Sequence, residues 1–166
     1  LGPLAPLSRG GQYVLHFTNG PKLVVPGQAE FQLTGSVKAP RLQARLPLED
    51  YVARVVDREG DAREVSAARA LAIAARSWLR QNSAPAAGAD GGCLQVDDDS
   101  RAQRVSPRPP TQAARAAAAF TAGLVLTGAP VRYQLDGPRP QVMTWRETVA
   151  ASRAGVNVEG LLRNAF

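Results

Sequence analysis

The sequence predicts an α+β fold, in which a β-rich N-terminal segment is followed by two packed helices, a β-ribbon and C-terminal helices. Short alternating apolar segments, broken by glycine and proline, fill residues 11–45. Apolar residues at helical spacing, many of them alanine, dominate from residue 48 to residue 82. Because strands come first and helices follow, the order is typical of α+β proteins rather than of regular βαβ alternation.

The N-terminal segment divides into a linker and a set of strands. Residues 1–10 are rich in leucine, proline and glycine without periodicity, so we expect a linker there. Asn19-Gly20 between two apolar runs is a strong hairpin signal, because both residues tolerate the positive φ of a tight turn. Within the β-rich lead-in, residues 11–45, we predict strands at 13–17, 22–25, 31–33 and 41–44.

Two helices and a long loop form the middle of the chain. Pro47 suits the start of a helix, and Glu49 and Asp50 place negative charge in its first turn, where the helix dipole favours it. We predict helices at 48–58 and 64–82. Residues 83–110, rich in Ala, Gly, Pro and Asp, predict a long irregular loop.

The last part of the chain alternates short elements. A helix is expected at 111–119, and strands at 123–127 and 131–134 are expected to pair around Gly128-Ala129-Pro130. Helices at about 144–154 and 157–164 close the chain, with Gly155 as the break between them.

Composition limits the class of protein and of partner. The chain has 166 residues, of which 45% are hydrophobic, so it can bury a core as a single domain. Its net charge of +6 favours an anionic partner, such as a polysaccharide with carboxylates, a lipid surface or a nucleic acid. The basic residues are scattered without interleaved aromatics, which disfavours nucleic acid. No run is long enough to predict a membrane span.

Glu59 is the residue that most suggests chemistry. Val52, Val55 and Val56 form the apolar stripe of the first predicted helix, and Glu59 falls on that stripe, four residues after Val55. A carboxyl group held there in a poorly hydrated cleft gains proton affinity, which is how an enzyme makes a general acid. The alternative is that Glu59 caps the interhelix turn or pairs with Arg63 or Arg76.

The sequence predicts no metal or cofactor site. Asp97-Asp98-Asp99 lacks the glycine and terminal glutamate of a calcium loop, so a solvated acidic loop is favoured. His16 and Cys93 are the chain's one histidine and one cysteine, and together they supply too few ligands for zinc. No Ser-His-Asp or Cys-His arrangement is indicated, because His16 lies in a different module from any candidate nucleophile.

Four collinear segments resemble the SpoIID/LytB family of bacterial cell-wall proteins. Residues 46–59 resemble the signature LPLEDYVAGVVxxE, with Arg54 where glycine is usual, and residues 70–78 resemble the helix AQAVAARTY. Residues 120–127 are similar to ATxGxVLTY, and residues 152–166 follow AKQGxSYEEILRHYY; Gln95-Val96 is a shorter echo of CQVY. The resemblance therefore identifies residues 46–166 as a SpoIID-like domain.

The chain also departs from the family pattern. Gly60-Asp61 replaces the Met-Pro that follows the family's glutamate, and no HxxCGG segment follows Val131-Arg132-Tyr133. Residues 138–146 stand where the family has GHGVGMSQYGA. Those family segments carry residues that line the cleft and, in some members, bind zinc, so their loss bears on turnover.

The resemblance implies action on peptidoglycan. SpoIID members are lytic transglycosylases and LytB members are modifiers of a cell-wall amidase; the family's catalytic glutamate matches Glu59. Lytic cleavage needs one carboxyl group, which protonates the glycosidic oxygen and then removes the proton of the sugar's C6 hydroxyl as that hydroxyl closes on C1. This scheme suits a chain with one well-placed glutamate and no catalytic histidine.

Three further residues are candidates for substrate binding. Arg76 could orient Glu59 or bind a substrate carboxylate through a bidentate fork, or it could be an ordinary helix arginine paired with Glu64 or an aspartate. Gln95 could donate to a sugar N-acetyl group, or be a plain loop glutamine. Trp145 is a candidate platform for stacking on a sugar face, whereas Trp78 belongs to an apolar stripe and is expected in the core.

We therefore expect a periplasmic or extracellular bacterial protein that acts on or binds peptidoglycan glycan strands. The first hypothesis is a lytic transglycosylase with Glu59 as both acid and base. The second is a catalytically degenerate binding module or one that regulates a partner, since cleft segments are missing. A third is a scaffold subunit that contacts another envelope protein.

Overall fold

Two antiparallel hairpins open the fold. The computed structural model describes residues 12–16, 22–26, 30–36, 39–85, 92–137 and 141–166. Strand β1 (Gln12–His16) pairs with β2 (Lys22–Pro26), and β3 (Glu30–Ser36) pairs with β4 (Ala39–Arg45). The predicted strands are confirmed, with ends displaced by the few residues usual for such boundaries. The predicted linker and the Asn19-Gly20 turn lie outside the described residues.

A helical hairpin forms the core. Helix α1 (Leu48–Glu59) starts directly after Pro47, and helix α2 (Val65–Asn82) follows five residues later. The inward face of α1 is made of valine and alanine, and α2 is buried almost continuously from Ala67 to Leu79. Alanine dominates that stretch, and small side chains allow neighbouring helix axes to approach closely. Both predicted helices are confirmed.

Three shorter helices complete the fold. Helix α3 (Gln112–Phe120) begins after Thr111, whose hydroxyl accepts the Ala114 N–H at 3.2 Å. Helices α4 (Trp145–Arg153) and α5 (Val158–Ala165) are separated by Gly155, whose φ of +90° suits glycine. These helices and the break at Gly155 confirm the prediction.

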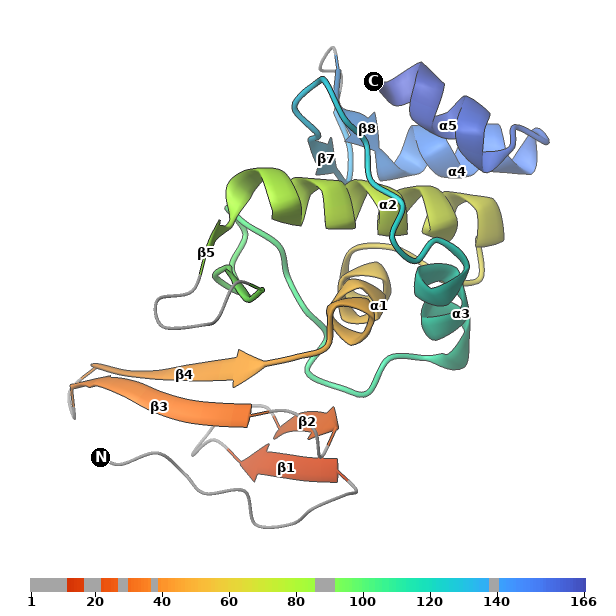
Figure 1. The fold of residues 1–166 in the computed structure, drawn as a ribbon. Helices are drawn as coiled ribbons and strands as arrows, with labels where there is room; N and C mark the ends of the chain where they lie inside the picture. The colour runs from red at the N-terminus through yellow and green to blue at the C-terminus, as the bar shows by residue number, and fades with distance from the viewer. Residues whose placement is uncertain (1–11, 17–21, 27–29, 37–38, 86–91, 138–140) are drawn as a thin grey trace.

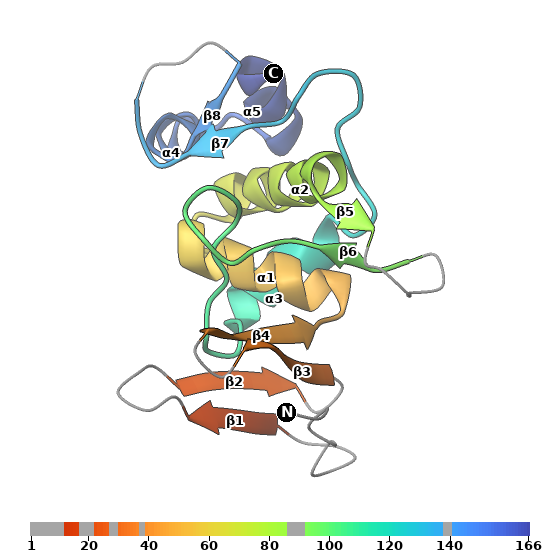
Figure 2. The same cartoon turned by 90° about the vertical axis from the view of Figure 1, so that its left-hand side faces the viewer.

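The elements lie in layers, as Figures 1 and 2 show. The hairpins form one end of the molecule, α1 and α3 lie next to them, and α2 crosses the middle. Helices α4 and α5 form the other end, together with the short parallel pair β7 (Tyr133–Gln134) and β8 (Met143–Thr144). Met143, Leu161 and Leu162 bring this end into the same core as α1 and α2. The architecture confirms the α+β class.

The predicted strand pair at 123–127 and 131–134 is wrong in its first member. Residues 124–127 form no strand, because polar side chains of α2 take the place of a partner strand. Arg76 donates to the Leu124 carbonyl at 3.1 Å, and the Ser77 hydroxyl accepts the Leu126 N–H at 2.8 Å. Gln81 donates to the Ala129 carbonyl and accepts the Val131 N–H. The backbone groups are therefore satisfied without a sheet.

The predicted loop at 83–110 contains one short strand pair. Strand β5 (Ala84–Pro85) pairs with β6 (Leu94–Gln95). The described remainder is irregular, as expected, and returns along α1 before α3 begins (Figure 2).

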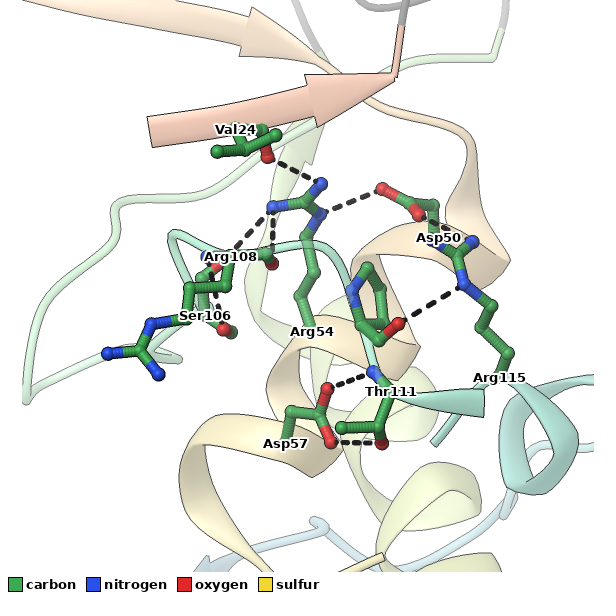
Figure 3. Close-up of polar contacts among 9 residues, drawn as sticks. Val24, Asp50, Arg54, Asp57, Ser106, Arg108, Thr111 and Arg115 are labelled. Carbon is green, nitrogen blue, oxygen red and sulfur yellow. Dashed lines mark hydrogen bonds and ion pairs between the residues drawn. The ribbon is translucent and has the colours of Figure 1, made fainter. Parts of the chain in front are cut away.

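Arg54 ties the first hairpin to the helical body (Figure 3). Its guanidinium is 1% exposed and pairs with Asp50 at 2.8 Å. It also donates to the carbonyls of Ser106, Arg108 and Val24 at 2.9–3.1 Å. The Val24 N–H donates to the Pro107 carbonyl at 2.7 Å, so both backbone groups of Val24 are held from the helical side. Strand β2 is thereby fixed to α1 and to the loop before α3.

Candidate functional site

Glu59 is the last residue of α1 and is half-buried. The helix ends there because Gly60 turns extended while its N–H still donates to the Val56 carbonyl at 3.0 Å. The helix therefore delivers the carboxyl group to the point where α1 meets the returning loop.

Two donors from different parts of the chain hold the Glu59 carboxyl group. The Arg104 backbone N–H donates to Oε1 at 2.8 Å, and the Tyr133 hydroxyl is the side-chain donor that acts on the same carboxyl group. The alternative prediction was that Glu59 pairs with Arg63 or Arg76. These arginines form ion pairs with other residues, Arg63 with Asp61 and Arg76 with Glu49. Glu59 is thus held by neutral donors of a loop and of β7.

Acidic side chains shape the loop that carries Arg104. Asp98 Oδ1 accepts the Val105 N–H at 3.0 Å, and Asp99 Oδ1 accepts the N–H groups of Arg101 and Ala102 at 2.7 and 3.0 Å. Such short-range bonds from aspartate fix turns in irregular backbone. The acidic run, which was predicted to be a solvated loop and has Asp97 and Asp98 exposed, therefore also fixes the backbone of that loop.

A buried glutamine lies behind this site. Gln103 is fully buried, and its amide nitrogen donates to the Ala75 carbonyl and to the Tyr133 hydroxyl, both at 2.9 Å. Its amide oxygen accepts the Tyr51 hydroxyl proton at 2.7 Å. Side chains from α1, the loop and β7 thus form one continuous network that ends on Glu59.

The surroundings raise the proton affinity of Glu59. Burial is the main cause, and it raises the pKa above the ordinary 4.5, with the negative charge of Asp98 acting in the same direction. The hydrogen bonds from Arg104 and Tyr133, and the positive charge of Arg104, oppose that rise in the pKa. Burial and the charge of Glu59 also raise the pKa values of Tyr51 and Tyr133, so the hydroxyl group of each stays protonated and able to donate a hydrogen bond.

The raised pKa predicts how stability depends on pH. Folding favours the protonated form of Glu59, so its stabilising contribution is complete below pH 4.5 and is lost as the pH rises through the folded-state pKa. The free energy of unfolding of the wild type, minus that of Glu59→Gln, is therefore expected to fall across this interval and then level off. Urea unfolding at a series of pH values measures it; a difference that grows with pH would contradict the raised pKa.

Trp145 lies against the residue that follows the glutamate. A Cβ added at Gly60 would come within 3.1 Å of the Trp145 ring and 2.7 Å of Leu71 Cδ2. Trp145 is half-buried and packs against the core. The structure therefore brings this predicted binding residue to Gly60, the residue that follows α1.

Gly60→Ala is expected to cost about 1–3 kcal/mol of unfolding free energy, because the added methyl overpacks this junction. Thermal or urea unfolding measures the loss. Gly92→Ala is the matched control, since a Cβ there meets nothing within 4 Å and the change should stay within about 0.5 kcal/mol. Equal effects at the two glycines would show that the close contact with Trp145 does not exist in solution.

Gln95 lies on a different part of the surface. It is exposed in β6 and lines an open hollow of about 560 Å³ that also includes Trp78, Asn82 and Arg101. A second hollow, of about 300 Å³, lies beside Gly60 and is lined by Asp57, Arg63 and Thr111. Glu59 lines neither of them. Trp78 is half-buried and packs against the core, as predicted, while one side faces the first hollow.

Arg76 is an interior residue in this structure. It is 1% exposed and forms a fork with Glu49, with hydrogen bonds of 3.1 and 2.5 Å. Its other donors reach the carbonyls of Leu124 and Ala118. The pairing with Glu64 foreseen as an alternative is replaced by Glu49, because Glu64 pairs with Arg153. Arg76 and Glu59 share no contact here, and its predicted role in substrate binding stays a prediction.

Sequence reasoning missed Gln103, Tyr133 and Tyr51 as parts of the site. Gln103 follows a run of charged residues, where a glutamine predicts an exposed position. One signal could have been used. Tyr51 and Glu59 lie eight residues apart in one predicted helix, and residues seven or eight apart share a helical face.

Comparison with known proteins places these residues in a family. The profile described as stage II sporulation protein, SpoIID, matches residues 38–127, which is more than half of the chain. The chain belongs to the SpoIID family. The match includes Glu59, Arg76, Gln95 and Gln103, and it confirms the resemblance that was based on the signature at residues 46–59.

One relative is similar to this chain over nearly its whole length. The uncharacterized protein YfaQ of Escherichia coli (strain K12) is 35% identical over 156 residues, which is 94% of this chain and 28% of YfaQ. The chain therefore spans less than a third of the length of this SpoIID-type relative. No solved structure gives a significant match.

Family membership indicates a role related to the bacterial cell wall. Among the described residues, no helix of this SpoIID member has the length and apolar character needed to cross a bilayer. The same residues contain no group of three or more His, Cys, Asp or Glu side chains placed to hold a metal ion.

Proposed function

We propose that this SpoIID domain acts on peptidoglycan glycan strands in the periplasm or at the cell surface, with Glu59 as a single acid and base. The observation that carries the proposal is the environment of Glu59: a half-buried carboxyl group with a raised pKa, held by the Arg104 N–H and the Tyr133 hydroxyl. A proton affinity raised by burial is the tuning found in glycosidase acids. Membership of the SpoIID family, which indicates a cell-wall-related role, supports peptidoglycan as the substrate class.

The proposed reaction is a lytic cleavage. Protonated Glu59 gives its proton to the glycosidic oxygen as the bond from that oxygen to C1 breaks. The carboxylate then takes the proton of the C6 hydroxyl, whose oxygen closes on C1 to form a 1,6-anhydro end. Atoms and charge balance, and no water or second carboxylate is consumed. In this proposal Trp145 stacks on a sugar ring, and Gln95 contacts a group further along the glycan strand.

A second candidate is a catalytically degenerate module that binds glycan strands or regulates a partner in an envelope assembly. The observation that favours it is that Glu59 lines neither described hollow, whereas Gln95 and Trp78 line the larger one. A chain with this arrangement can bind a saccharide at the hollow without cleaving it.

Product analysis tests the first candidate. Purified protein and Glu59→Gln are incubated with peptide-free glycan strands, and mass spectrometry detects 1,6-anhydro ends. We expect product from the wild type and none from the variant. Glu159→Gln makes the same chemical change at an exposed helix position and should leave the product unchanged. Absence of product from the wild type would rule out the enzyme.

Sedimentation with insoluble cell wall tests the second candidate. If the domain only binds, wild type and Glu59→Gln should pellet equally with the wall and release no product. A protein that stays in the supernatant at low salt would exclude binding to this polymer as the function.

A further inference from the structure

The orientation of the Gln103 amide follows from one neighbour. The Ala75 carbonyl can only accept a hydrogen bond, so the amide atom that faces it at 2.9 Å must be the nitrogen. The amide oxygen therefore faces Tyr51, whose hydroxyl has to be the donor in that bond of 2.7 Å. The assignment does not depend on which way the side chain is drawn, because the reverse orientation would place two oxygens together.

This orientation decides where the Tyr133 proton points. The second N–H of Gln103 donates to the Tyr133 hydroxyl oxygen at 2.9 Å. That oxygen accepts from Gln103, so its own proton is free to be donated in another direction, and the remaining partner is the Glu59 carboxyl group. Ala75 in α2 thus sets, through Gln103, the direction of a hydrogen bond at the end of α1.

We propose that Gln103 is a positioning residue for Glu59: its amide holds the Tyr133 hydroxyl so that the hydroxyl proton always points to the glutamate. This proposal rests on the function proposed above, for which it names the groups that control the acid. Gln103 is fully buried, and its amide is linked to Glu59 through the Tyr133 hydroxyl, which it contacts at 2.9 Å.

The effect of Gln103 on Tyr133 depends on a hydrogen-bond network whose buried polar groups all have partners. The described titratable and charged groups that act on Glu59 are Tyr133 from β7 and Arg104 and Asp98 from the loop. Tyr51 on the same helix feels the charge of Glu59, and its raised pKa keeps it neutral while Glu59 titrates. All hydrogen-bonding groups of the Gln103 amide have partners inside the protein, and no buried side-chain polar atom of the described residues lacks one. A fully satisfied network holds its members in one arrangement.

Titration of the Glu59 carboxyl carbon by ¹³C NMR tests the proposal without any substrate. Tyr133→Phe removes the donor and should raise the midpoint by about one pH unit, since a hydrogen bond to a charged group favours the ionised form. Tyr51→Phe is the matched control, because it removes a hydroxyl from the other side of Gln103 while Ala75 still fixes the amide. Its midpoint should stay close to that of the wild type.

A double-variant cycle then isolates Gln103. Gln103→Met, which keeps the length of the side chain but donates nothing, should raise the midpoint, and the variant that combines it with Tyr133→Phe should raise it no further than Tyr133→Phe alone. An unchanged midpoint in Tyr133→Phe would overturn the proposal, as would additive effects in the double variant.

A measurement on native Gln103 covers the case in which Gln103→Met does not fold. Hydrogen exchange of the Gln103 side-chain amide protons should accelerate in Tyr133→Phe and remain slow in Tyr51→Phe, and equal exchange in both variants would overturn the proposal. The titration is separate from catalysis. If the Tyr133 and Gln103 variants shift the Glu59 midpoint non-additively but no 1,6-anhydro product forms, the lytic function is refuted and the positioning role is kept. If product forms but the shifts are additive, the positioning role is refuted and the lytic function is kept.

Discussion

Arg54→Met is expected to lower the free energy of unfolding by about 3–5 kcal/mol, because it leaves a buried charge without its main partner. Arg54 is 1% exposed, and Asp50, at 10% exposure of its side chain, would keep only the longer contact to Arg115 at 3.3 Å. The carbonyls of Val24, Ser106 and Arg108 would lose their donor as well. Urea unfolding monitored by circular dichroism measures the loss.

Arg115→Met is the control for this prediction. Arg115 pairs with the same aspartate, but its side chain is 52% exposed, and exposed pairs are worth less than about 1 kcal/mol. A similar loss in both variants would mean that Asp50, and not the buried guanidinium, is what the fold depends on.

Arg76→Lys is expected to cost about 3 kcal/mol of unfolding free energy, because a lysine cannot reproduce the fork to Glu49 together with the bonds to backbone carbonyls. The ammonium group would keep one charge contact and leave at least one buried acceptor without a partner. The result also separates two roles for Arg76, since an interior ion pair and a substrate contact fail in different assays.

The same variant is therefore measured for binding to cell wall under conditions where it is fully folded. An interior role predicts the loss of stability with binding unchanged, whereas a role in substrate binding predicts weaker sedimentation with the wall and little change in unfolding. Arg80→Lys makes the identical change in the exposed last turn of α2 and should alter neither quantity.

The regular elements could be predicted because each depends on local pattern. The valine stripe and Pro47 define α1, and Gly155 separates the last two helices, as expected from its φ of +90°. The strand expected at 123–127 failed for a tertiary reason. Its apolar residues suit a strand, but Arg76 and Ser77 on α2 bind its backbone in place of a neighbouring strand.

The candidate site could be predicted only in part. The position of Glu59 at the end of a helix follows from helical spacing and from the family signature, while the predicted binding role of Trp145, which lies against Gly60, stays a prediction. Gln103 and Tyr133 could not be found, because the hydrogen bonds of Gln103 to Ala75, Tyr133 and Tyr51 join residues 28, 30 and 52 positions apart in sequence, and no local pattern reports such pairings.

The carboxylates of Asp98 and Asp99, which fix the turns of the loop, bear on Glu59 in its proposed role of giving and then taking a proton. Hydrogen bonds from Arg101 and Ala102 lower the pKa of Asp99 below its ordinary value, while the pKa of Glu59 is raised. Asp99 therefore remains an anion over the whole range in which Glu59 gains and loses its proton. The turn that Asp99 holds therefore stays the same in both protonation states of Glu59, so in the proposed reaction bond cleavage and ring closure would meet one geometry of this turn.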